Sequence, residues 1–306
     1  MLIEQAFFSL PEVLHGSGYQ TQSYESGIVS ALSLSLLQVL NGRNVPNPIG
    51  CLLSERLYRY DGIYNQGAQP RYLRADLFAD VNRLYVANKR LSQYGWRHDN
   101  WLECKFLRGQ AGNGDSHAGN KSPITGSVLA DLLRLALLIP EPGNQTRAGR
   151  YFLHVYDADP KFYLTFRGRP WCKSLVAVGE QEIHISQLDA EPNTIKRLIG
   201  ELPGLDVKLR VTNFHAGPLH VEHRPVYWCW LTRIDKVEAS LGDDSVIINL
   251  NRTITQTGGG LTTIAAFLAE RIAILPDSPD TQPPRPDEQE AAANDGREED
   301  GGLAEV

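Results

Sequence analysis

The spacing of apolar residues predicts an α/β protein with helices and strands mixed in its first half. Residues at helical spacing predict helices over 23–40 and 127–139, the first ended by Asn41-Gly42. Alternating or continuous apolar runs predict strands over 71–81, 100–107 and 151–156. For the first of these, Leu77, Val81, Leu84 and Leu91 could equally mark a helix further on. The polar stretch 109–126 predicts a long loop before the second helix.

Beyond residue 157 the pattern changes to short apolar runs, which predict a β-rich second half. The predicted strands are 162–166, 174–178, 182–186, 205–214, 226–238 and 245–250. Two further helices are predicted at 194–202 and 261–275. The expected organisation is a core over 1–160, a β-rich extension or subdomain over 161–276 and a tail over 277–306.

Composition and charge refine this organisation. Of 306 residues, 42% are hydrophobic and 22% are charged, which is ordinary for a globular protein that needs no disulfides to fold. The net charge of −6 divides unevenly: 277–306 carries ten acidic and two basic residues, so the remainder is slightly basic at +2. The tail's composition predicts disorder. Its simplest interpretation is a solvated terminus; the alternative is an anionic competitor for a basic groove.

The cysteines and the N-terminal residues indicate a cytoplasmic chain. The four cysteines are scattered without a C-x-x-C pair, so we expect reduced thiols. The first residues lack the basic and apolar regions of a signal peptide, and the apolar stretch 28–40 is too short and too rich in serine to span a bilayer. We therefore expect no membrane association.

Candidate chemistry lies in the 100–107 strand. Side chains alternate along a strand, so Glu103 and Lys105 face one side and Leu102, Cys104 and Phe106 the other. A Glu-x-Lys pair alone is common and usually marks a solvated face. Here large apolar residues surround it, which predicts a central strand whose two charges have a function.

The order of the predicted elements is a helix, strands, the Glu-x-Lys strand, a helix and a buried strand. This order resembles the core of the PD-(D/E)xK nuclease superfamily, the restriction-endonuclease-like fold, over about residues 20–160. The resemblance places Asp76 on the strand before Glu103 and Lys105, and Glu25 on the first helix. Glu25 has an equally weighted alternative as a first-turn glutamate favoured by the helix dipole.

The match to the family departs from its pattern at the aspartate. Ala75 replaces the proline of the motif, and the gap from Asp76 to Glu103 is long for a simple hairpin. Asp80 is the main rival for the same role, and Asp61 a weaker one. Asp99 is too close to Glu103 in sequence to lie on the opposing strand.

The resemblance implies a Mg²⁺-dependent endonuclease for DNA, with Mn²⁺ as a substitute. Asp76 or Asp80, with Glu103 and the Cys104 carbonyl, would hold the metal, and Lys105 would orient the attacking water. A homodimer would cut both strands, and restriction or phage defence, within a larger assembly, fits by analogy. One alternative is a catalytically silent module that binds nucleic acid or a partner protein. Another is an unrelated α/β protein whose Glu103 and Lys105 are solvent-exposed.

Three other patterns carry weaker signals. One is a group that invites a zinc interpretation but lacks standard spacing, so surface or core histidines are favoured: His215, His220, Glu222, His223 and Cys229. Aromatic residues suited to base stacking are expected to be at least half core: Trp171, Tyr227, Trp228 and Trp230. Basic residues suited to phosphate contacts flank the proposed site: Arg71, Arg74, Arg97 and Arg108.

Overall fold

A computed structural model describes the residues that form the fold. These are residues 1–16, 25–57, 74–82, 96–107, 121–138, 148–164, 170–185, 204–221, 224–249 and 253–264. The chain divides into two compact units, Met1–Ile274 and Leu275–Val306. All described residues belong to the first unit, so the predicted acidic tail lies outside them.

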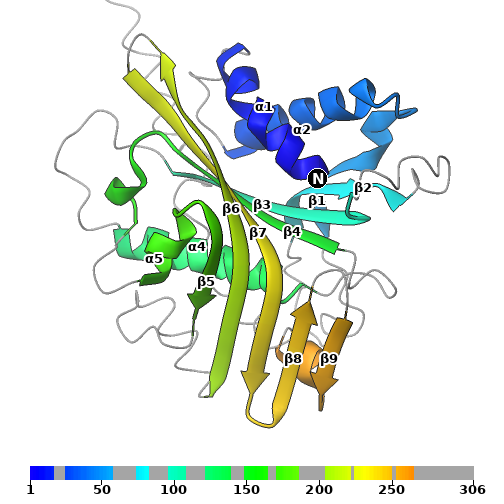
Figure 1. Ribbon diagram of the computed structural model, residues 1–306, viewed down its shortest axis with the longest axis vertical. Coiled ribbons are helices and arrows are strands. Elements are labelled where there is room, and N and C mark those ends of the chain that lie inside the picture. Colours follow the sequence, from blue (N-terminus) through cyan, green and yellow to red (C-terminus); the bar gives the residue numbers. More distant parts are fainter. Residues whose placement is uncertain are drawn as a thin grey trace, which may run out of the picture. The chain divides into compact units, whose positions relative to one another are not determined.

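The fold is α/β, with one mixed, largely antiparallel sheet of nine strands and few helices (Figure 1). The helices are α1 (Leu2–Gly16), α2 (Glu25–Gly42), α4 (Lys121–Ala136) and α5 (Pro170–Leu175), with short 3-10 helices at Pro48–Cys51 and Pro160–Phe162. The first strands are β1 (Leu52–Leu57), β2 (Arg74–Asp80), β3 (Asp99–Leu107), β4 (Ala148–Tyr156) and β5 (Gly179–His184). The remaining strands are β6 (Leu205–Val221), β7 (Arg224–Leu241), β8 (Asp244–Asn249) and β9 (Thr253–Thr257).

The strand order is β1-β2-β3-β4-β7-β6-β5, and β8 pairs with both β7 and β9. Among the strands described, only β3 and β4 run parallel, with α4 between them in the chain as in a usual crossover connection; the other pairings are antiparallel. Because β4 pairs with β7, strands from both sides of residue 160 belong to one sheet. The boundary at residue 160 stays a prediction.

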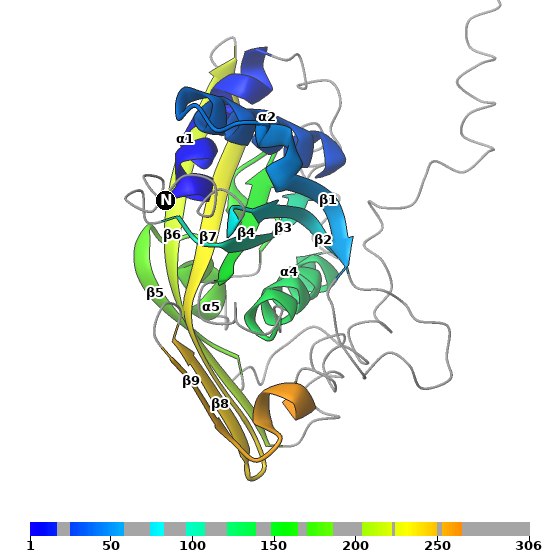
Figure 2. The same cartoon turned by 90° about the vertical axis from the view of Figure 1, so that its right-hand side faces the viewer.

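Helices cover both faces of the β2–β3–β4 part of the sheet. Figure 2 shows α1 and α2 on one face and α4 on the other. Alternate residues of β3 therefore join two separate cores: Leu102, Cys104 and Phe106 pack with α1 and α2. Trp101 and Leu107 pack with α4. The two-sided burial explains why this strand is apolar on both faces around its charged pair.

Several predicted elements differ from the structure. Residues 121–126, expected in a loop, begin α4, because Pro123 falls in the first turn, where no backbone N–H has an intrahelical partner. This helix ends at Ala136, three residues before the predicted end. The strands predicted at 162–166 and 174–178 are wrong for the described residues. Pro160 and Pro170 begin a 3-10 turn and α5 there instead.

Other elements agree with the sequence or extend beyond it. The strands predicted at 71–81, 100–107 and 151–156 are confirmed as β2, β3 and β4, with residues 71–73 outside the described part. Helix α1 and strands β1 and β9 were not predicted, and the predicted helix 194–202 lies outside the described residues. Among the helices described, none is long and apolar enough to cross a bilayer.

Candidate active site

Strand β3 is central, and it carries its charged pair into the interior. All nine of its residues are buried, and the exposed fractions are 3% for Glu103 and 9% for Lys105. Both side chains lie on the face that α4 covers. The alternative in which this pair is a solvent-exposed accident is therefore wrong.

The ladder between β2 and β3 ends beside this pair. Its last register pair is Leu77 with Leu102, so Asp76 is the first residue of β2 beyond the ladder. There, side-chain carboxylates accept the backbone N–H groups of β3. The Asp76 Oδ2 accepts from Cys104 N at 2.6 Å, and the Glu25 Oε2 accepts from Phe106 N at 3.4 Å. Tertiary structure thus brings the predicted Glu25 and Asp76 to the Glu-x-Lys strand.

Helix α4 adds two charged residues that were not predicted as candidates. The Lys105 Nζ lies 3.4 Å from Asp131 Oδ2 and 3.9 Å from Glu25 Oε2. Arg134 pairs with Asp131 one turn away on its own helix, and its Nε lies 3.7 Å from Glu103 Oε1. The result is a continuous set of ion pairs that links β3, α4 and the start of α2. Together with the adjacent Asp76 of β2, these residues are hereafter called the charged cluster.

The charged cluster has an excess of negative charge. Among the described residues it comprises Glu25, Asp76, Glu103 and Asp131 against Lys105 and Arg134. Burial, reinforced by neighbouring carboxylates, raises the pKa of Glu25 to about 7 and that of Asp76 to about 6. Asp131 raises the pKa of Lys105 and keeps it charged. With all six groups ionised the cluster carries −2, which one divalent cation would neutralise.

The rival aspartates lie elsewhere. Asp80 is four residues along β2 from Asp76, about 13 Å at the rise of a strand. It pairs in register with Asp99, and both contact Asn82 rather than the charged cluster. The structure therefore separates Asp80 from the predicted metal ligands, because the strand carries it to the opposite end of the ladder. Asp61 lies outside the described residues.

Cys104 and His154 lie beside the charged pair, and both are neutral. Burial raises the pKa of the Cys104 thiol, so only its backbone is suited to bind a hard cation. His154 is opposite Lys105 in the register, but burial lowers its pKa to about 3. Its ring nitrogens lie 2.8 Å from Tyr156 Oη and 3.2 Å from Thr232 Oγ1. His154 is therefore a structural group in the sheet.

The other sequence signals do not join this cluster. His215 stacks on Trp230 while Cys229, one register pair away, packs on the opposite face, so these two do not share a metal site. Described residues on both sides of this group form the paired strands β6 and β7, and the side chains of His220, Glu222 and His223 lie outside the described part. Trp171 and Trp230 are core residues, as predicted for at least half of the aromatics.

The flanking arginines also differ from expectation. Arg97 is buried near Tyr151 and not at the charged cluster, whereas Arg74 is exposed and pairs with Glu55 at 2.7 Å. Arg71 and Arg108 lie outside the described residues. Neither of the two described arginines, Arg74 and Arg97, contacts the charged cluster in an interaction given for the described residues.

The donor atoms suit a hard divalent cation in kind and in charge. Carboxylate oxygens are the ligands that Mg²⁺ prefers. Within the described part of the chain, no three His, Cys, Asp or Glu side chains converge as a metal site. The ligand set expected from the sequence has only two side chains, Asp76 and Glu103, and one backbone carbonyl. Their oxygen donors and the negative charge of the cluster fit a hard divalent cation.

The apolar spacing of the helix predicted its buried stripe but gave no role to Asp131 and Arg134. Asp131 is three residues after Val128 and four before Leu135, so it lies on the buried stripe of α4. A charged residue on such a stripe is seldom buried without a partner. The place of Asp131 on the buried stripe was therefore the signal that it has a partner, and Arg134, one turn further along the helix, is such a partner.

Comparison of the chain with protein-family models, curated proteins and solved structures finds no match. What the charged cluster does is therefore inferred from its own residues.

Proposed function

We propose that the charged cluster is the active site of a metal-dependent DNA endonuclease of the PD-(D/E)xK type. The observation that carries this proposal is the excess of carboxylates around Lys105, of which Glu103 and Asp131 are buried and Glu25 and Asp76 half-buried. Burying an uncompensated charge is costly, so such an excess is seldom kept without a function. The order α2, β1 to β3, α4 and β4 also agrees with the order that the resemblance implies.

The residues that would hold Mg²⁺ are Asp76, Glu103 and the backbone of Cys104. The N–H and C=O of one strand residue point toward the same neighbouring strand. Because Cys104 N–H points to Asp76, its carbonyl oxygen faces the same side. Mg²⁺ bound there supplies charge that stabilises the phosphoryl oxygens during hydrolysis.

Lys105 is the group suited to the attacking water. Its ammonium stays charged beside Asp131, so it would orient the water by donating a hydrogen bond and would offset negative charge at phosphorus. Glu25, whose pKa of about 7 lies near neutrality, is suited to accept the water's proton. Cutting both strands of a duplex requires two such sites, so we propose a homodimer as the cleaving form.

A catalytically silent module is the second candidate. The observation that favours it is that Lys105 and Arg134 already have carboxylate partners within 4 Å, so ion pairing holds the cluster together. Such a module would bind DNA or a partner protein without turnover.

Cleavage of supercoiled and linear DNA with Mg²⁺ or Mn²⁺ tests the proposal. Wild type is compared with Glu103→Gln and Lys105→Met, and with Asp80→Asn as a matched carboxylate outside the cluster. We expect metal-dependent cutting by wild type and Asp80→Asn, lost in the other two at matched folding. DNA bound equally by all four proteins, with no cutting by any, would contradict the nuclease and favour the silent module.

A further inference from the structure

Arg134 lies against Glu103, the carboxylate that binds the metal ion in the proposed function. Its guanidinium contacts Asp131 through Nη2 and approaches Glu103 through Nε at 3.7 Å. The Glu103 side chain is 4% exposed and that of Arg134 is 20% exposed, so water screens this approach weakly. Arg134 also acts on Asp76 electrostatically. One cation from α4 therefore acts on both proposed metal-binding carboxylates.

We propose that Arg134 is a built-in competitor of the divalent cation, and that it sets the affinity of the site by neutralising Glu103. This inference rests on the proposed function, since it takes Glu103 as a ligand. Metal binding would move the guanidinium away from Glu103, and Asp131 would keep it paired. Because the Asp131 carboxylate also holds Lys105, the water-orienting ammonium need not move at the same time.

If Arg134 competes with the metal ion, its removal changes the affinity of the site for divalent cations. Two cations near one carboxylate repel each other, so removing Arg134 should tighten divalent binding. A merely structural Arg134 would lower stability when it is removed, but divalent ions would bind no more tightly. The two roles therefore predict different outcomes: tighter metal binding if Arg134 competes, and equal or weaker binding if it is only structural.

The test is direct Mn²⁺ binding to the full chain, by titration calorimetry and by the loss of the free Mn²⁺ electron-spin resonance signal. The proteins are wild type, Arg134→Gln, Arg134→Lys and the control Arg210→Gln, an exposed charge on β6. We expect Arg134→Gln to bind Mn²⁺ at least about tenfold more tightly, and Arg210→Gln to match wild type. The melting temperature of Arg134→Gln should fall without metal and rise more than that of wild type on adding Mn²⁺.

Each outcome separates this inference from the proposed function. Equal or weaker Mn²⁺ binding by folded Arg134→Gln, with wild type binding, would overturn the competition and leave the nuclease intact. No Mn²⁺ binding by any of the proteins would overturn both. If Arg134→Gln does not fold, Arg134→Lys keeps the charge but loses the planar fork that reaches both carboxylates. Its affinity should then rise severalfold, and an unchanged affinity would overturn the competition.

Discussion

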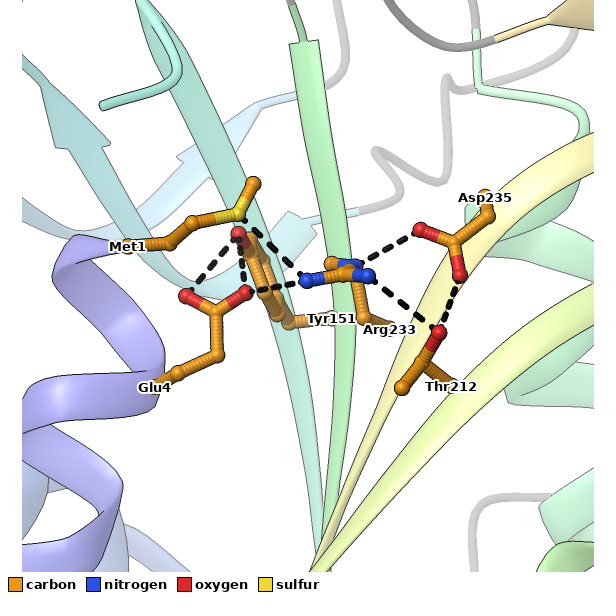
Figure 3. Close-up of polar contacts among 6 residues, drawn as sticks. All are labelled: Met1, Glu4, Tyr151, Thr212, Arg233 and Asp235. Carbon is orange, nitrogen blue, oxygen red and sulfur yellow. Dashed lines mark hydrogen bonds and ion pairs between the residues drawn. The ribbon is translucent and has the colours of Figure 1, made fainter. Parts of the chain in front are cut away.

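Two buried polar groups on opposite faces of the sheet differ in their balance of charge. On the α1 face, Arg233 donates to Glu4 at 2.9 Å, to Asp235 at 2.6 Å and to Thr212 at 3.2 Å (Figure 3). Tyr151 makes longer contacts with Glu4, at 3.4 and 3.5 Å. We call this set the Arg233 network; it joins α1 to β4, β6 and β7.

The Arg233 network is balanced, whereas the charged cluster is not. Two carboxylates, Glu4 and Asp235, face Arg233 and the nearby Arg97, and hydrogen bonds raise the pKa of Arg233. In the charged cluster the carboxylates outnumber the cations, and the pKa values of Glu25 and Asp76 rise. A balanced buried network fixes one arrangement of the fold, while an excess of like charge is typical of a site that binds something.

The largest expected difference is in catalysis. Glu103→Gln should lower DNA cleavage by about a thousandfold or more, the order found when a group that stabilises the transition state is removed. Glu4→Gln, an equivalent change in the Arg233 network, should leave the rate per folded molecule unchanged. Initial rates on plasmid DNA, with the folded fraction measured by circular dichroism, check this. Equal losses in both variants would remove the distinction between the two regions.

The second difference is in stability. Arg233→Leu leaves Glu4 and Asp235 without their shared hydrogen-bond donor, and breaking such a pair costs about 3–5 kcal/mol. Urea denaturation measures the free energy of unfolding, with the exposed Arg210→Leu as a control expected within about 0.5 kcal/mol of wild type. The loss should be independent of Mg²⁺. A loss below about 1 kcal/mol would show that the Arg233 network does not hold the fold.

The third difference is in pH dependence. The folded-state pKa of Glu25, about 7, lies above its ordinary value of 4.5. The stability that this group contributes is therefore fully present below pH 4.5 and is lost as the pH rises to 7. In a buffer that contains a metal chelator, the free energy of unfolding of wild type should fall by roughly 3 kcal/mol relative to Glu25→Gln between pH 4.5 and pH 7. This figure follows from about 1.4 kcal/mol for each pKa unit. Urea denaturation at several pH values measures it, and a flat difference would contradict the raised pKa.

The smallest difference concerns tyrosine hydroxyls. Tyr151→Phe should cost no more than about 1 kcal/mol of stability, because the contacts of this hydroxyl with Glu4 are long. Tyr156→Phe is the matched control: it loses a 2.8 Å contact with His154 and should cost more. Thermal unfolding of both variants ranks them. A reversed order would show that Tyr151 contributes more to the Arg233 network than its distances indicate.

Local features of the fold were predictable, while features that depend on distant contacts were not. The alternation over 100–107 predicted which side chains of β3 share a face, because side chains of any strand alternate. The short apolar runs over 162–166 and 174–178 predicted strands, yet Pro160 and Pro170, just before these runs, begin helical turns. The loop expected through residue 126 became helix, since Pro123 is tolerated in a first turn.

The sequence by itself determined the faces of β3 and the helical stripe of α4, because each depends on the periodicity of one local element. Tertiary structure alone decided which charges meet. Glu25 reaches β3 only because the β2 ladder ends at Leu77, and Asp131 reaches Lys105 only because α4 packs on that face. Whether a buried charge is balanced depends on partners far away in sequence. For that reason the contrast between the charged cluster and the Arg233 network exists only in the folded chain.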